Sequence, residues 1–184
     1  MHIRELKHSD IEKVKAFTDL SIGKNYFSAE ELKQSFEKSS LNGIMCSFVL
    51  VDDLENIHGL RLAYPPGKWE KGKGNGLSSH LWRVPREKVA YFQSLFLSDS
   101  AQGLGFGPKL SEAAISAFKE LKAEAIVTHA WKESPNNSSV KYLTRFGFES
   151  VAVHPLYWND IDYECSLDGK PCRCTAEEMI LYFK

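Results

Sequence analysis

Three glycines at alternate positions, Gly103, Gly105 and Gly107, follow a strand-like run and open a helix-like run. Glycine permits positive φ and has no side chain to hold a ligand away from the backbone. The first N–H groups of a helix lack internal partners and lie at the positive end of the helix dipole. The loop of residues 98–107 therefore predicts a site at which the main chain contacts a phosphate or pyrophosphate group.

Two elements must position this loop. Residues 88–97 are rich in aromatic and branched side chains, which is typical of a buried strand. The residues after the loop repeat apolar side chains at the spacing of one helical face, and Pro108 suits the first turn of a helix. That apolar face comprises Leu110, Ala113, Ala114, Ala117, Phe118 and Leu121.

The spacing of the glycines separates the classes of phosphate ligand. A dinucleotide fingerprint needs its third glycine one residue later, and a Walker loop needs a lysine where Lys109 does not lie. The form Gln102-x-x-Gly105-x-Gly107 instead resembles the coenzyme A pyrophosphate loop of the GNAT acyltransferase superfamily. A glycine-rich turn without a ligand is the alternative.

A second motif of this superfamily is an asparagine followed by a short helix and a Gly-Phe pair, and it matches Asn136 and Gly147-Phe148. The resemblance implies an α/β (α+β) fold with a central mixed, twisted sheet flanked by helices. In that fold the strands at 88–97 and 125–131 run parallel and splay apart, and the pantetheine arm bonds their unpaired backbone groups. The residues implied to bind the coenzyme are Leu95, Leu97, Gln102, Gly103, Leu104, Gly105, Phe106, Gly107 and Asn136.

The reaction implied by the resemblance is transfer of an acetyl group from acetyl-CoA, as co-substrate, to an amine of a small molecule or peptide. A backbone N–H near Leu97 is the expected donor to the thioester oxygen. The superfamily often carries a tyrosine acid where this chain has Leu143, so the neighbouring Tyr142 is the candidate acid, and a packing role is its alternative. His129 is the candidate base, with Glu133 or water as other proton acceptors and a structural histidine as the alternative.

Leu143 also motivates a second hypothesis, a non-catalytic module that binds coenzyme A or acyl-CoA. A nucleotide-binding regulator is a third. Thiol release from acetyl-CoA in the presence of amines separates the first two, because a binding module turns over no amine.

The chain of 184 residues suits one domain. The resemblance covers residues 1–160, and residues 161–184 are expected to form a hairpin and a last strand packed on that domain. The formal net charge is −1 and no apolar run reaches the length of a membrane span, so neither nucleic acid nor membrane is expected as a partner. The lack of an apolar signal segment predicts a cytoplasmic protein with reduced cysteines. A homodimer is left open.

Elsewhere, residues 2–6, 45–52 and 57–63 read as strands. Capping boxes at Ser9 and Ser28 predict the starts of two helices between the strand at 2–6 and the hairpin formed by the strands at 45–52 and 57–63.

Residues 64–80 break the pattern of helices and strands, because they hold two prolines, four glycines and three lysines. We expect a long loop and the most mobile internal segment of the chain. The favoured interpretation is a solvated crossover between strands, and the other is a mobile flap near the acceptor site with Trp69 as a contact.

Cys165, Asp168, Cys172 and Cys174 form an incomplete zinc-knuckle pattern near the C-terminus, because Asp168 occupies the position of a second cysteine. Cys172 and Cys174 are too close in sequence for a comfortable disulfide. The sequence favours a reduced hairpin without metal, closed by Asp168-Gly169 and followed by a strand at 179–183, and leaves zinc as the alternative.

Overall fold

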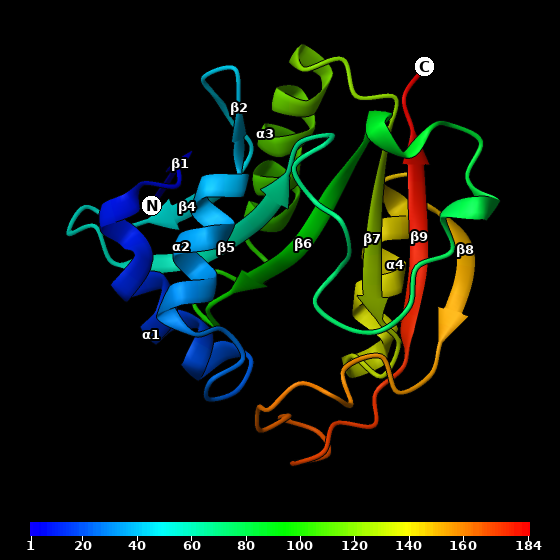
Figure 1. Cartoon of the computed structure of the whole chain (residues 1–184). Coiled ribbons are helices and arrows are strands. Elements are labelled where there is room, and N and C mark those ends of the chain that lie inside the picture. The colour runs from blue at the N-terminus through cyan, green and yellow to red at the C-terminus, as the bar shows by residue number, and fades with distance from the viewer.

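One twisted sheet of seven strands forms the frame of the protein in a computed structural model, which describes residues 1–184 (Figure 1). The strand order is β1-β4-β5-β6-β7-β9-β8, and β6–β7 is the only parallel pair. The strands of this sheet are β1 (His2–Glu5), β4 (Phe48–Val51), β5 (Ile57–Tyr64), β6 (Val89–Leu97), β7 (Ala125–Trp131), β8 (Glu149–His154) and β9 (Ala176–Tyr182). The expected central mixed sheet is therefore confirmed.

Helices cover both faces of the sheet (Figure 1). The four α-helices are α1 (Ile11–Ser21), α2 (Ala29–Lys38), α3 (Phe106–Glu120) and α4 (Ser138–Arg145). The short elements are η1 (His8–Asp10), η2 (Ser79–Leu81), η3 (Arg86–Lys88), η4 (Pro135–Asn137) and the small hairpin of β2 (Ser40–Leu41) and β3 (Ile44–Met45). The prolines and asparagines of these connections end the regular elements, as turn chemistry predicts.

One of the two predicted helix starts is confirmed. Ser28 caps α2, because its hydroxyl accepts from the Glu31 N–H at 3.1 Å and the Glu31 carboxylate accepts from the Ser28 N–H at 2.8 Å. The helix predicted after Ser9 exists as α1, but the capping box at Ser9 is wrong, because Ser9 lies inside η1 and α1 begins at Ile11. Asp10 is held there instead by the Arg4 guanidinium at 2.7 Å.

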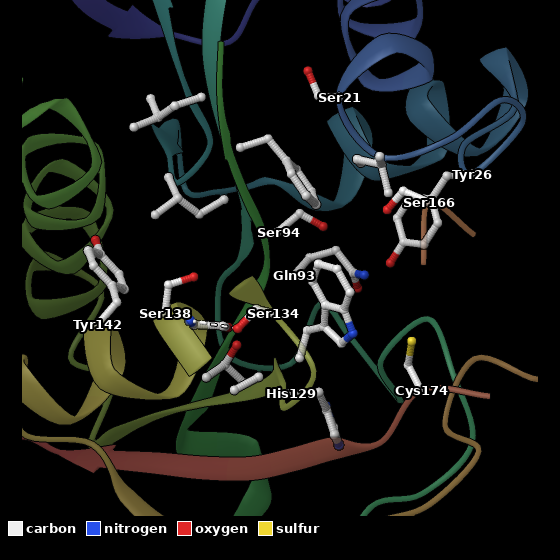
Figure 2. Close-up of a pocket in the computed structure, with 18 of the residues that line it drawn as sticks. Ser21, Tyr26, Gln93, Ser94, His129, Ser134, Ser138, Tyr142, Ser166 and Cys174 are labelled. Atoms are coloured by element: carbon white, nitrogen blue, oxygen red, sulfur yellow. Dashed lines mark hydrogen bonds between the residues drawn. The ribbon is translucent and has the colours of Figure 1, made fainter. Parts of the chain in front are cut away.

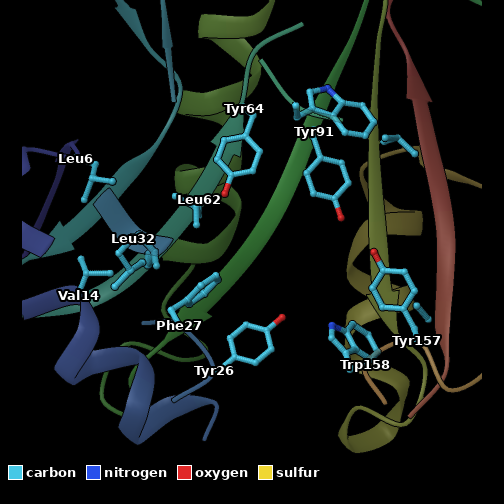
Figure 3. Packing of buried hydrophobic residues seen from close by; sticks show 14 of the residues in the cluster. Leu6, Val14, Tyr26, Phe27, Leu32, Leu62, Tyr64, Tyr91, Tyr157 and Trp158 are labelled. Carbon is cyan, nitrogen blue, oxygen red and sulfur yellow. The ribbon is translucent and has the colours of Figure 1, made fainter. Parts of the chain in front are cut away.

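The core divides between the two faces of the sheet. On one face, α3 and α4 bury a cluster that includes Phe92, Phe118 and Phe148. On the other, α1, α2 and the irregular segment before β9 bury the largest cluster, which is rich in aromatic side chains (Figure 3). In that view Tyr26 from the α1–α2 connection faces Trp158 from the C-terminal segment. Aromatic side chains therefore line the space between the two halves of the sheet.

The parallel pair β6–β7 opens along its length. Its register runs from Val89 opposite Ala125 to Phe92 opposite Thr128, and no pairing follows. At the same point the β5–β6 register jumps from Leu62 opposite Ser94 to Ala63 opposite Phe92, which leaves Gln93 as the extra residue of a β-bulge. A bulge bends its strand, so it turns the second half of β6 away from β7. The splayed parallel strands expected from the sequence are confirmed.

The long loop after β5 packs against the sheet, so its interpretation as a solvated crossover is wrong. Trp69 is buried and its indole donates to the Val89 carbonyl at 2.8 Å. The Ser78 N–H and the Trp82 indole both donate at 2.8 Å to the carboxylate of Glu178, which is fully buried on β9. These anchors hold the loop across β6, β7 and β9 (Figure 1).

The C-terminal strand is an interior strand of the sheet. β9 pairs with β7 along its whole length and with β8 on its other side, so the expected last strand is confirmed with an earlier start, at Ala176. Residues 155–175 before it are irregular apart from a Cys165–Gly169 bridge. None of the helices has the length and apolar character needed to span a membrane.

Candidate active site

The opening between β6 and β7 is a cavity of about 630 Å³ that reaches both faces of the sheet (Figure 2). One side is lined by Leu95, Leu97, Gln102, Ser138 and Tyr142, from β6, the glycine loop and α4. The other side is lined by residues from the end of α1, the α1–α2 connection and the C-terminal segment, namely Ser21, Ile22, Tyr26, Trp158, Tyr163, Cys165, Ser166 and Cys174. A long ligand can therefore enter from the glycine loop and meet a second molecule from the opposite side.

The glycine loop adopts the conformation that its sequence demands. Gly103 and Gly105 have φ of 74° and 79°, which side chains strongly disfavour, and a Cβ on either would find no atom within 4 Å. Gly105 is the residue that caps α3, so the free N–H groups of the first helical turn begin directly after it. The backbone around Gly103 and Gly105 is thus open to a ligand at the positive end of the α3 dipole.

The third glycine has a different role. Gly107 is buried, and a Cβ there would lie 3.5 Å from Leu97, 3.7 Å from Leu95 and 3.8 Å from Tyr142. These are ordinary van der Waals distances, so the first turn of α3 packs on β6 and α4 here and an alanine would also fit.

Gln102, at the start of the motif, is fixed by the strand that the loop leaves. Its amide donates to the Leu97 carbonyl at 3.2 Å and to Asp99 at 3.3 Å. The side chain therefore braces the turn from β6 into the loop, and its position at the mouth of the cavity is compatible with a contact to the coenzyme.

Asn136 lies beside the cavity, but it does not line it. It is exposed and adopts φ of 55°, and Asn137 follows at 53°, so these two residues form the tight turn into α4. Ser134, Pro135 and Ser138 from the same turn line the cavity instead. The asparagine motif therefore predicts the turn into α4, but it does not predict which side chain of the turn faces the cavity.

Tyr142 projects from α4 toward α3, with one edge on the cavity (Figure 2). Its hydroxyl donates to the Gly107 carbonyl at 2.9 Å and lies 2.7 Å from the Ser111 hydroxyl. Ser111 accepts in turn from the Arg61 guanidinium at 2.6 Å. Leu143, at the position of the usual tyrosine, is buried in the core. Arg61 and Ser111 carried no sequence motif, and only the fold reveals their place in this network.

Arg61 is a buried cation without a carboxylate partner. It is 3% exposed, and its guanidinium lies 4.1 Å from the centre of the Phe92 ring. Burial lowers the pKa of Arg61 to about 10, which still leaves it charged at neutral pH. A positive charge therefore lies close under the first turns of α3.

His129 does not have the geometry of an accessible base. Its side chain is 2% exposed, so what it contributes to the cavity lining is main chain. Its Nδ1 lies 2.9 Å from the Tyr91 hydroxyl, and its ring stacks on Tyr157 at 4.4 Å. Burial and the neighbouring His154 lower the pKa of His129 to about 3, so the ring is neutral at neutral pH. This arrangement disfavours the expected role as base and fits the structural alternative.

Glu133 is equally unsuited to act as a base. It is exposed, and its carboxylate accepts from the Thr175 N–H at 2.9 Å. That bond ties the end of β7 to the segment before β9. Of the residues that line the cavity, only Arg61 carries a charge, and no carboxylate lines it.

The buried His129 predicts a loss of stability in acid. A free histidine titrates near pH 6.5 and the folded one near 3, so the unfolded chain binds the additional proton first. Stability is therefore complete above pH 6.5 and falls as the pH drops toward 3. We expect urea unfolding to show about 2 kcal/mol less stability at pH 5 than at pH 7 from this group.

The matched variants are His129→Gln and His80→Gln, because His80 is an exposed histidine on η2. The His129 variant should flatten the dependence of unfolding free energy on pH between 7 and 5, whereas the His80 variant should not. If the unfolding free energy of His129→Gln depends on pH as steeply as that of the wild type, the loss of stability in acid does not come from this ring.

Comparison with known proteins assigns the chain to a family from its sequence. The profile of the Acetyltransferase (GNAT) family matches residues 24–148, which is more than half of the chain. No curated protein matches the chain in sequence.

Solved structures share the fold at low sequence identity. Naa20 from Chaetomium thermophilum, in complex with a bisubstrate analogue, has a TM-score of 0.71 at 16% identity, over 100% of this chain and 87% of that one. The ribosomal-protein-S18-alanine N-acetyltransferase from Escherichia coli has 0.69 at 13%, over 98% and 92%. The putative acetyltransferase yncA from Salmonella typhimurium, with its cofactor acetyl-CoA, has 0.67 at 16%, over 100% and 94%. The chain therefore belongs to the Acetyltransferase (GNAT) family and is an acetyl-CoA-dependent N-acetyltransferase.

Proposed function

We propose that acetyl-CoA lies in the opening between β6 and β7, with its pyrophosphate on the N–H groups of residues 103–107. The observation that carries this proposal is the end of β6–β7 pairing after Phe92 and Thr128, directly before the glycine loop. The unpaired backbone beyond that point needs hydrogen-bond partners, and the amides of a pantetheine arm supply them. Leu95, Leu97 and Gln102 line this path and are the proposed contacts, together with the open backbone of Gly103 and Gly105.

The acetyl group then points toward the side of the cavity formed by the α1–α2 connection and the C-terminal segment. Tyr26 and Tyr163 contact each other edge to face at 4.9 Å across this side, and Trp158 lines it with them. No carboxylate lines the cavity to pair with a charged ammonium group, and burial penalises charge, so the site favours a neutral amine. The proposed acceptor is therefore an amine of a small molecule or a peptide that enters from this side and loses its proton on the way.

In the proposed reaction the neutral amine attacks the thioester carbon. A backbone N–H near Leu97 that faces the opening donates to the oxygen as negative charge develops there. The carbon–sulfur bond then breaks, and the leaving thiolate takes the proton of the Tyr142 hydroxyl, which turns away from the Gly107 carbonyl to donate it. The chain of donors from Arg61 through Ser111 to that hydroxyl offsets the negative charge left on the tyrosine oxygen. The proton of the amine goes to water, since no carboxylate or accessible histidine lines the cavity.

The direct test is thiol release from acetyl-CoA in the presence of a panel of small amines and of peptides with free N-termini or lysines, with mass spectrometry of the products. We expect at least one amine to gain an acetyl group at the same rate as free thiol appears. Saturable coenzyme binding without turnover of any amine would instead support a binding module.

The lack of an enzyme base predicts that the pH dependence of the rate belongs to the acceptor. We expect kcat/KM to rise with pH until the free amine is deprotonated, and the break to move when a less basic acceptor replaces a more basic one. The measurement is the pH profile of kcat/KM for two acceptors of different basicity. A break that stays at one pH for both acceptors would assign the proton transfer to a side chain.

A further inference from the structure

Four groups at the C-terminal side of the cavity converge in space. The sulfurs of Cys165, Cys172 and Cys174 and a carboxylate oxygen of Asp168 all lie within 4.8 Å of one another. The three cysteines are buried, and Asp168 closes the cluster from the solvent side. These residues belong to a segment without regular structure, so the turn at 165–169 and the return of the chain at 172–174 bring them together.

Two of the separations match those in a tetrahedral metal site. A zinc–sulfur bond of about 2.3 Å puts two sulfur ligands about 3.8 Å apart at the tetrahedral angle, and a sulfur and an oxygen ligand about 3.5 Å apart. The Sγ atoms of Cys165 and Cys174 are 3.8 Å apart, and Cys174 Sγ lies 3.3 Å from Asp168 Oδ2. A disulfide needs about 2.05 Å between its sulfurs, and it would leave the third thiol and the carboxylate without a role.

The surroundings orient the proposed ligands. The backbone N–H groups of Asp168 and Leu167 point at the Cys165 sulfur, in a turn closed by two 2.9 Å bonds between Cys165 and Gly169. The Tyr163 hydroxyl donates to the Cys172 sulfur at 3.2 Å. Asp168 also accepts from the Arg173 N–H at 3.1 Å. Such outer contacts are the usual support of a metal site, because they fix the ligands in place before the ion arrives.

The segment has almost no regular structure to hold its shape, although several of its side chains are buried in the core. Residues 155–175 contain no helix and only one bridge, yet their side chains form one wall of the cavity. A long irregular segment inside a compact domain is uncommon unless something fixes it. A metal ion bound by four residues of this segment would add such a constraint.

We propose that Cys165, Asp168, Cys172 and Cys174 bind one structural zinc ion through three thiolates and one carboxylate. Thiolates select zinc over the harder magnesium and calcium ions, and four protein ligands leave no open position for substrate. The ion fixes the wall that carries Tyr163 and Ser166, and thus the shape of the acceptor side. We take the zinc alternative over the metal-free hairpin that the sequence favours, because the sequence shows the spacing of these residues and the structure adds their convergence.

The first test measures metal in the whole protein, purified in reductant without an affinity tag or metal resin. We expect about one zinc per chain by mass spectrometry in the wild type. Cys172→Ser should lose it, and Cys46→Ser should keep it, because Cys46 is equally buried but lies outside the cluster. Wild-type protein that holds no zinc and binds none when Zn²⁺ is added would overturn the proposal. So would a mass that shows a disulfide among these cysteines.

The second test keeps the fold and changes one ligand. Asp168→Cys completes a four-thiolate site, so we expect zinc affinity about tenfold higher or more, measured by competition with a chelator. Asp168→Ala should lower it by about the same factor. With Co²⁺ in place of zinc, the wild type should show tetrahedral absorption bands with sulfur charge transfer, and Asp168→Cys should strengthen the latter. An unchanged affinity and spectrum in both variants would show that Asp168 is not a ligand.

Discussion

Gly105→Val is expected to weaken acetyl-CoA binding by about two orders of magnitude. Valine at this position places its branched side chain in the open space where the pyrophosphate is proposed to lie. It also forces a branched residue into a backbone with φ of 79°, which costs about 1–2 kcal/mol of stability. We expect the dissociation constant for acetyl-CoA, measured by calorimetry, to rise on the order of 100-fold, which is about 3 kcal/mol.

The backbone strain needs its own control, and the chain provides one. Gly43 in the β2–β3 turn has φ of 81°, and a Cβ added to it would also find no atom within 4 Å. Gly43→Val should therefore lower the melting temperature about as much as Gly105→Val while it leaves coenzyme affinity unchanged. If Gly105→Val binds acetyl-CoA like the wild type, the coenzyme is not on this loop.

Tyr142→Phe is expected to lower kcat by about 10- to 100-fold and to leave KM for acetyl-CoA within about threefold of the wild type. The variant keeps the ring, which packs on Phe146 at 5.1 Å, and removes only the hydroxyl that reaches Gly107 and Ser111. A thiolate is a fair leaving group even without an acid, so we expect a slower reaction rather than none. Steady-state kinetics with the best acceptor of the amine panel gives both parameters.

Tyr64→Phe is the matched control, because Tyr64 is a buried tyrosine whose hydroxyl donates to Ser35 at 2.9 Å. It does not line the cavity between β6 and β7. Both variants should lose about 1 kcal/mol of stability from the missing hydrogen bond, but only Tyr142→Phe should lose turnover. Equal kcat values in the two variants would leave Tyr142 with a packing role, the alternative that its sequence position leaves open.

The sequence carries most of the information on the coenzyme side of the site. The glycine pattern lies between a strand rich in branched and aromatic residues and an amphipathic helix. The conformation of such a loop depends mainly on residues that are neighbours in the sequence. A turn with positive φ and the start of a helix beside it therefore follow from residue types, but these do not single out Gly103 and Gly105 over Gly107. The bulge at Gln93 has no such signal, because it depends on the register of a neighbouring strand.

The proton-transfer residues are harder to predict, because their environments are built from distant segments. His129 becomes buried and neutral only when Tyr157 and the loop after β5 cover it. That loop lies so close that a Cβ on its Gly72 would be 3.1 Å from the Nδ1 of His129. The lysines and glycines of the same loop favour a solvated segment when the sequence is read alone. Its glycines in fact allow the backbone to approach aromatic side chains closely, and Trp69 and Trp82 anchor it.

Arg61 is a residue whose role the sequence did not indicate at all. It lies in the middle of an ordinary hydrophobic strand, and its sequence context predicts neither burial nor partners. Only the packing of α3 over β5 brings it to Ser111 and so to Tyr142. Similarly, the cysteines near the C-terminus have a suggestive spacing, but their geometry requires the chain to fold back at residues 172–174.

The central claim is the place of the coenzyme, and a crystal structure with acetyl-CoA bound tests it most directly. We predict a pyrophosphate on the backbone N–H groups of residues 103–107, a pantetheine arm that bonds β6 and β7 beyond Phe92 and Thr128, and an acetyl group that faces Tyr26 and Trp158. Acetyl-CoA bound elsewhere, with the glycine loop empty and the β6–β7 opening unoccupied, would contradict the account.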